Sequence, residues 1–263
     1  GNVPTSATAS GSFAIKRPDG KFLLIMGTGI TTTACTTSGT ATNIYDQYAP
    51  PGSRFTNGPC LSATAGQGAF AMQNADGTFT ILHGNATTST TIYNPVRNTM
   101  TDGPLQTTGT NVGGLAIPLA GPNNNMYKVI VGTTLGGAVA TTTMVYNANS
   151  KIFTAGTALG VGSGSGAFAF QRQDGFWILV KGTATGTTSL INPYTGAEAA
   201  GVALTTSTAD RGAHVIPRAD GTFLIIGGNA VSGVGVTTNI YVPWGGAFNA
   251  TAGGYQGLTA VGP

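Results

Sequence analysis

The sequence carries very little charge. Of its 263 residues, 7% are Asp, Glu, Lys or Arg, against about 25% in an average soluble protein. The net charge of +3 is scattered, and only Lys16, Arg17 and Lys21 cluster. A nucleic-acid-binding protein needs a stripe of Lys and Arg that displaces counterions from phosphates. We therefore expect no nucleic acid among the partners. We expect a surface hydrated largely by Thr and Ser hydroxyls, and the β-branched Thr suits strands.

Long apolar runs are also missing. The longest ones, such as Phe22–Met26 and Phe223–Ile226, stop after four or five residues, whereas a transmembrane helix needs about 20. We therefore expect no membrane span. With 41% hydrophobic residues, the chain can still bury a large core, and all-β rings of this size commonly form one domain.

Residues that bind metals or transfer protons are scarce. The chain has two histidines, His83 and His214, and zinc or copper needs several converging nitrogen or sulfur ligands. Four of the eight acidic residues stand before glycine at expected turns: Asp19, Asp76, Asp174 and Asp220. We expect the other four at solvated strand edges, without the facing pair that glycoside hydrolysis requires: Asp46, Asp102, Glu198 and Asp210. The sequence thus predicts no catalytic residue, no metal site and no cofactor.

What the sequence does contain is one short pattern, five times over. Each copy has a glycine, an apolar strand, a tight turn and a second apolar strand that ends on glycine. The copies begin at Gly11, Gly68, Gly113, Gly166 and Gly212. Their steps of 57, 45, 53 and 46 residues are typical of one supersecondary unit per repeat. Asp-Gly at four of the five turns favours a two-residue hairpin, and the third repeat has a longer loop, Gly121 to Met126.

Two further strands complete each repeat. A third strand resembling Ile-Tyr-Asn-Pro recurs at 43–46, 91–95, 144–147, 190–193 and 239–243. Seven residues past its tyrosine, three repeats place a bulky apolar residue that starts a fourth strand: Met100, Phe153 and Phe248. No segment shows the apolar spacing of a helix. The sequence predicts an all-β fold, a β-propeller of five four-stranded blades with almost no helix.

These residues resemble the kelch repeat and the central domains of galactose-oxidase-like proteins. The strand ending on glycine, the tyrosine strand and the bulky residue seven positions later all match, as in Ile92–Met100. The diglycine of that family is kept at Gly227-Gly228, and its tryptophan is replaced by Met100, Phe153, Phe248 and Glu198. The resemblance implies a kelch-like propeller. The copper oxidases of the group rely on a tyrosine, cysteine and histidine constellation that we cannot assemble here.

The first ten residues stand apart from the repeats. Ser6–Ala9 matches Ser62–Ala65, so residues 1–10 are predicted to be an extra outer-strand segment or a linker, ahead of a propeller at 11–263. Three hypotheses follow. The segment closes the ring on the last blade, remains from a longer upstream array, or pairs with a neighbouring molecule, since an unpaired strand and an open edge can join copies into a filament.

Three features point to an extracellular setting. Cys35 and Cys60 are the only cysteines, so they form either a disulfide or two unrelated buried thiols. Asn85-Ala-Thr and Asn249-Ala-Thr are acceptor sequences for N-glycosylation. Together with the low charge, they favour a secreted or cell-surface protein.

The functional prediction rests on the scarcity of metal-binding and proton-transferring residues and on a polar, nearly uncharged surface. Trp244, beside two glycines, is a candidate for stacking on a sugar or a partner, with core packing as the alternative. We expect a non-catalytic structural or adhesive module of an extracellular filament, surface coat or adhesin that self-associates, by terminal strand exchange in one version. The alternatives are a carbohydrate-binding, lectin-like propeller and a carbohydrate-active enzyme.

Overall fold

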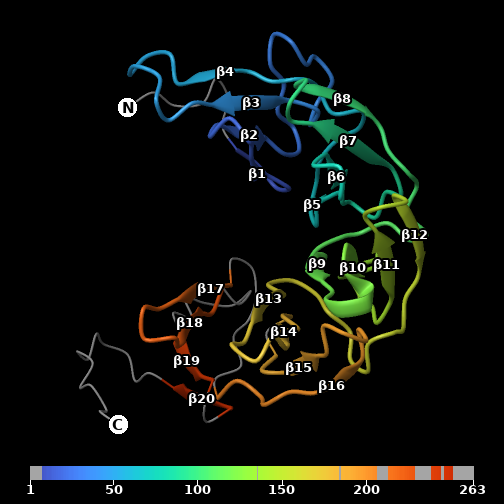
Figure 1. Ribbon diagram of the computed structural model, residues 1–263, viewed down its shortest axis with the longest axis vertical. Coiled ribbons are helices and arrows are strands. Elements are labelled where there is room, and N and C mark those ends of the chain that lie inside the picture. The colour runs from blue at the N-terminus through green and yellow to red at the C-terminus, as the bar shows by residue number, and fades with distance from the viewer. Residues whose placement is uncertain are drawn as a thin grey trace.

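The repeats fold into five four-stranded antiparallel sheets. The computed structural model describes residues 8–134, 136–183, 185–205, 213–228, 238–243 and 246–250. Figure 1 shows the sheets as blades that follow one another along an arc, with blade 1 and blade 5 at its two ends. The fold is a kelch-like β-propeller of five blades, which confirms the prediction. In the described part of the chain, the one helical element is the 3-10 turn η1 (Gly121–Asn123), within the long turn of the third repeat. No helix there has the length and hydropathy to cross a membrane.

The strands of a blade follow chain order from the inner to the outer rim of the arc (Figure 1). Blade 1 contains β1 (Phe13–Lys16), β2 (Phe22–Ile25), β3 (Thr42–Tyr45) and β4 (Phe55–Asn57). Blade 2 contains β5 (Phe70–Gln73), β6 (Phe79–Leu82), β7 (Thr90–Asn94) and β8 (Thr99–Asp102). Blade 3 contains β9 (Leu115–Pro118), β10 (Met126–Ile130), β11 (Thr143–Asn147) and β12 (Ile152–Ala155). Blade 4 contains β13 (Phe168–Gln171), β14 (Trp177–Val180), β15 (Thr188–Ile191) and β16 (Glu198–Ala200). Blade 5 contains β17 (His214–Pro217), β18 (Phe223–Ile226), β19 (Thr238–Val242) and β20 (Ala247–Ala250).

One row of cross-strand partners recurs in every blade. In blade 2, Phe79 pairs with Tyr93, and Tyr93 pairs with Met100. We call this set the cross-strand row. Its counterparts are Phe22, Tyr45, Phe55; Tyr127, Tyr146, Phe153; Trp177, Ile191, Glu198; and Phe223, Tyr241, Phe248. The spacing of seven residues after the tyrosine therefore does place the bulky residue opposite it on the fourth strand.

The core of the protein lies between successive blades. Tyr93 of blade 2 is fully buried in a cluster with Leu23 and Ile25 of blade 1. Tyr146 of blade 3 is buried against Met72 of blade 2 in the same way. Because side chains alternate along a strand, each central blade uses one face of its sheet for the preceding blade and the other face for the next.

The repeated glycine at the start of each copy is required by this stacking. Gly68 has φ +77°, and a Cβ built on it would lie 1.9 Å from the carbonyl oxygen of Asn111 in the connection to blade 3. A Cβ on Gly113 would lie 1.9 Å from the carbonyl oxygen of Gly164. Only glycine tolerates this approach of neighbouring backbones together with a positive φ. The fifth of these glycines, Gly212, lies outside the described residues.

Blade 1 is held by a disulfide and by two backbone hydrogen bonds from the end of the N-terminal segment. Cys35 and Cys60 form a disulfide with their Cα atoms 5.4 Å apart, and Cys35 is buried in a small cluster with Met26 and Ala41. Of the predicted extra segment at 1–10, residues 1–7 lie outside the described part. At its end, the backbone N–H of Ala9 donates to the Met26 carbonyl over 2.9 Å, and the Ser10 carbonyl accepts from Thr28 over 2.9 Å.

Candidate binding cleft between the first two blades

A cleft of about 780 Å³ lies between blades 1 and 2. It is lined by β1, β5, the Asp-Gly turn of blade 2 and the turn between β7 and β8. Its apolar part comes from rings and aliphatic groups that are half-buried or exposed, among them Phe13, Phe70, Phe79 and Val96. Val96 is 83% exposed. We call this cavity the cleft. A partly exposed aromatic surface is the usual platform for an amphipathic ligand such as a sugar.

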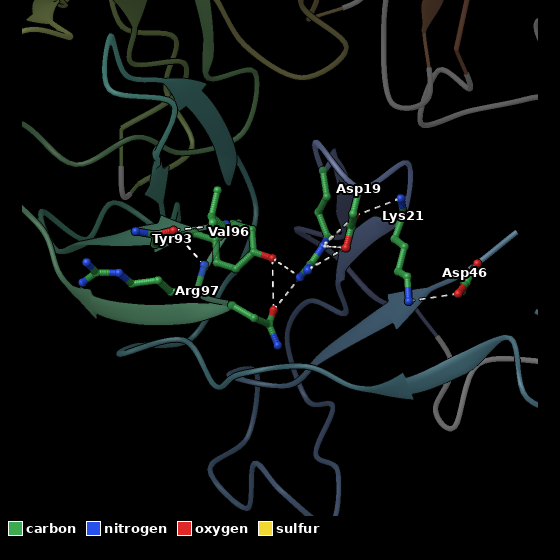
Figure 2. Close-up of polar contacts among 9 residues, drawn as sticks. Asp19, Lys21, Asp46, Tyr93, Val96 and Arg97 are labelled. Atoms are coloured by element: carbon green, nitrogen blue, oxygen red, sulfur yellow. Dashed lines mark hydrogen bonds and ion pairs between the residues drawn. The ribbon is translucent and has the colours of Figure 1, made fainter. Parts of the chain in front are cut away.

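The wall between the two blades is held by Arg17. Its Nη1 donates over 2.6 Å to the hydroxyl of Tyr93 and over 2.6 Å to Oδ1 of Asn98, both in blade 2. Its Nη2 donates over 2.9 Å to Asp19 in its own turn. Figure 2 shows these contacts beside the Lys21–Asp46 ion pair, whose closest atoms are 3.0 Å apart.

The charges of this network stabilise one another. The hydrogen bond from Arg17 is the main reason that the pKa of Asp19 lies below its usual range. Burial works to lower the pKa of Arg17, but the bond to Asp19 and the field of Tyr93 outweigh it, so this pKa is raised. Burial raises the pKa of Tyr93. At neutral pH, Arg17 is therefore charged and Tyr93 is a neutral acceptor. The guanidinium of Arg17 already has its hydrogen-bond partners within the protein.

The rim of the cleft is shaped by two fixed turns. Oδ1 of Asn94 accepts hydrogen bonds from the backbone N–H groups of Val96 and Arg97, over 3.1 and 3.0 Å. Asp76 accepts a 2.7 Å bond from Lys151 of blade 3, and this bond is the main cause that lowers the pKa of Asp76 to about 2. The Asp76 carboxylate on the rim is therefore ionised, and Lys151 balances its charge.

Two cations on the cleft are left without a counter-charge. Lys16 and Arg97 both line it and both are exposed. Within the part of the chain that the structure describes, neither side chain makes an ion pair or a hydrogen bond. Since Arg17 and Asp76 are each paired within the protein, the cleft presents a net positive charge. In a chain with 7% charged residues, this concentration favours an anionic ligand.

The histidine at the same blade interface is committed to the fold. His83 is fully buried; Nδ1 lies 3.0 Å from the Ser89 hydroxyl, and Nε2 lies 2.8 Å from the Thr91 hydroxyl. Burial lowers its pKa to about 4. The ring is thus neutral at physiological pH and bonded on both sides. The other histidine, His214, is exposed on β17.

One acidic residue is not where we expected it. Glu198 is not a solvated edge residue: its side chain is 13% exposed and pairs over 2.5 Å with Lys181, which is 1% exposed. Its carboxylate also accepts from the Ser189 hydroxyl and, over 2.7 Å, from the Gly160 backbone N–H. The hydrogen bond from Gly160 ties the connection after blade 3 to the outer strand of blade 4. The expectation was wrong because Glu198 occupies the last position of the cross-strand row, which faces the preceding blade.

Of the remaining predicted site residues, Asn85 and Asn249 are not among those that line the cleft. Asn85 is exposed, with φ +51°, and its Oδ1 accepts from the Gln67 backbone N–H over 3.0 Å. Asn249 lies in β20, and Trp244 lies outside the described residues. The sequence analysis did not identify Lys16, Arg97 or the aromatic wall as site residues. The one available signal was the small cationic cluster at Lys16, Arg17 and Lys21.

Comparisons with known proteins indicate the fold and little else. No protein-family model matches the chain, and a search of curated proteins found no match either. Among solved structures, the chain is similar to a fungal alcohol oxidase of the AA5 family in complex with copper, with a TM-score of 0.66 and 16% identity. The match covers 95% of this chain and 54% of the oxidase. The chain therefore spans about half the length of that enzyme.

The described residues do not fit a copper centre. Both cysteine sulfurs are joined in the disulfide, and both nitrogens of His83 face hydroxyl groups. Within the described ranges, no three His, Cys, Asp or Glu side chains gather closely enough to hold a metal ion. The structural similarity thus supports the propeller fold of this chain, but the described residues provide no set of copper ligands.

Proposed function

We propose that the protein is a non-catalytic adhesive module of an extracellular filament, surface coat or adhesin, and that it binds acidic glycans in the cleft. The observation that carries this proposal is the unneutralised guanidinium of Arg97 beside a partly exposed aromatic wall, with Lys16 adding positive charge where β1 ends at the cleft. A uronic acid or sulfated sugar offers the complementary groups. Its anionic group pairs with Lys or Arg, and its C–H face packs on aromatic rings.

The dimensions and rigidity of the cleft support the same ligand class. Its volume of about 780 Å³ falls within the usual range for small-molecule sites, roughly 300–1,000 Å³. The Arg17 network and the Asn94 turn fix the cleft wall and rim before any ligand arrives. A preformed site spends little binding energy on ordering its own side chains.

An extracellular, non-catalytic role is supported by how the fold uses its reactive groups. The disulfide is typical of an oxidising compartment. His83 and Glu198 are buried in contacts that hold strands and blades together. The alternative of a carbohydrate-active enzyme requires two carboxylates that face each other across a sugar, and the cleft is lined by the single carboxylate of Asp76.

Calorimetric titration with short oligogalacturonides tests the proposal, with neutral cello-oligosaccharides as the matched ligand control. We expect the acidic ligand to bind and its affinity to fall as salt is raised, because two ionic contacts are screened. The double variant Lys16→Ala/Arg97→Ala should lose at least about tenfold in affinity, the equivalent of about 1.4 kcal/mol. Arg54→Ala removes a positive charge outside the cleft and should bind like the wild type. Equal binding of both sugars, or full binding by the double variant, would refute the proposal.

A further inference from the structure

Two of the blade contacts contain a tyrosine that reaches into the turn of the preceding blade. The hydroxyl of Tyr93 accepts from Arg17 over 2.6 Å. The hydroxyl of Tyr146, one blade later, donates to Asn74 over 2.6 Å. Arg17 and Asn74 both stand at the first position of an Asp-Gly turn, since each carbonyl accepts from the turn glycine. Arg172 and Arg218 hold the same position in blades 4 and 5.

Among the described residues, blade 1 presents the corresponding tyrosine face with no blade packed in front of it. Phe22, Tyr45 and Phe55 form its cross-strand row, with ring centroids 6.4 and 5.0 Å apart. The matching row in blade 3 has nearly the same spacings, 6.3 and 4.5 Å, and packs against blade 2. In blade 1, the residues facing blade 2 are Leu23 and Ile25, so the alternating row lies on the opposite face. Its three rings are half-buried, whereas Tyr93 and Tyr146 have no exposed surface.

Blade 5 presents the complementary face. Ile225 and Tyr241 of this blade pack against blade 4, so Ile216, Leu224 and Ile226 lie on the other side of the sheet. Ile216 is 42% exposed, while Met72, its counterpart in blade 2, is 1% exposed. Leu224 and Ile226 are half-buried. Arg218 stands where Arg17 stands in blade 1, and its guanidinium has only a 3.7 Å contact with Asp220 within the described residues.

The two faces are separated within one molecule. Figure 1 shows blade 1 and blade 5 at opposite ends of the arc, and no described strand of one pairs with a strand of the other. We infer that blade 5 of one copy packs against blade 1 of a second copy, with the guanidinium of Arg218 donating to the Tyr45 hydroxyl. The occupant is a second copy because the chain itself carries both halves of a contact that it makes between its own blades. Such a head-to-tail contact repeats from copy to copy, and it does not depend on glycan binding.

Sedimentation velocity of the full 263-residue chain, over a concentration series without glycan, tests this inference. We expect the wild type to associate as concentration rises, and Arg218→Glu to remain monomeric. Thr154→Glu places the same new charge on the exposed edge of blade 3 and should associate like the wild type. Circular dichroism and the melting temperature show whether each variant is folded. Adding Tyr45→Lys to Arg218→Glu creates a new ion pair across the same contact and should restore association.

Cross-linking identifies which molecule supplies each face. The variant carrying both Tyr45→Cys and Arg218→Cys is oxidised mildly and analysed by mass. A ladder of cross-linked multimers is the expected result. Cross-links formed only within single chains, a wild type that is monomeric throughout the series, or an Arg218→Glu variant that associates like the wild type would each overturn the inference.

Discussion

The guanidinium of Arg17 in the first turn of blade 1 donates a 2.6 Å hydrogen bond to the buried hydroxyl of Tyr93 in the third strand of blade 2. The two residues are 76 positions apart. This bond links two repeats and at the same time forms one wall of the cleft. Because the wall is satisfied internally, the cations left for a ligand are Lys16 and Arg97.

Replacing Tyr93 by Phe removes the acceptor of a buried, charge-assisted hydrogen bond. We expect Tyr93→Phe to lower the free energy of unfolding by about 1–3 kcal/mol, measured by urea denaturation. Tyr194→Phe is the matched control, because Tyr194 is 52% exposed and should change stability by less than about 0.5 kcal/mol. Equal effects of the two substitutions would mean that the Arg17–Tyr93 bond contributes nothing.

Alanine substitutions at Gly68 and Gly77 distinguish backbone strain from a steric clash. Gly68 and Gly77 both have a positive φ, +77° and +80°, so alanine is strained at either position. A Cβ on Gly68 also collides with the Asn111 carbonyl, while nothing lies within 4 Å of one on Gly77. Gly68→Ala should therefore destabilise the protein by at least about 2 kcal/mol more than Gly77→Ala. Thermal denaturation of the two variants side by side decides the point, and similar melting temperatures would contradict the stacking argument.

Burial of His83 makes stability depend on pH in a defined window. Its pKa falls from 6.5 to about 4 in the folded protein, so the unfolded chain takes up the proton first as pH falls. The contribution is fully present above pH 6.5 and is lost progressively down to about pH 4. At about 1.4 kcal/mol per pKa unit, the loss is about 3 kcal/mol.

The measurement is the free energy of unfolding at several pH values for the wild type and for His83→Gln. Glutamine keeps a polar group near Ser89 and Thr91 but does not titrate in this range, so the slope between pH 6.5 and 4 should be shallower in the variant. The same slope in both proteins would show that His83 takes no part in it.

The disulfide should stabilise the first repeat because it restricts the unfolded chain. Cys35 and Cys60 are 25 residues apart, and closing a loop of this length is worth about 2–4 kcal/mol. The double variant Cys35→Ser/Cys60→Ser should unfold at correspondingly lower urea. Hydrogen exchange should also speed up around Met26, which packs against Cys35. Unchanged exchange there would show that the packing of this loop does not depend on the disulfide.

Much of the fold could be predicted from the sequence because the repeat is encoded locally. The Asp-Gly turns, the glycines that end strands and the tyrosine strand each depend on neighbours a few residues away. All five first strands begin two residues after the predicted glycine, as β5 does after Gly68, and the strand register places Met100 opposite Tyr93. Phe55 was missed as a member of the same row because it follows Tyr45 by ten residues instead of seven.

The candidate site could not be predicted in the same way, because it depends on how one blade lies on the next. Arg17 and Tyr93 meet only through that stacking. The same holds for Glu198, which meets Gly160 from the connection after blade 3 as well as Lys181 in its own blade. Nor does the repeat pattern show which cations stay unpaired, since Lys16 and Arg17 are adjacent in the sequence and yet Lys16 is exposed and Arg17 is buried.

The location of glycan binding is the central claim, and NMR tests it most directly. Amide spectra of the isotope-labelled protein are recorded while a short oligogalacturonide is titrated in. The account predicts saturable shifts at Phe13, Lys16, Phe70 and Arg97, with no change in the loop from Thr28 to Thr42. Shifts confined to that loop or to other blades, with the cleft amides unmoved, would contradict it.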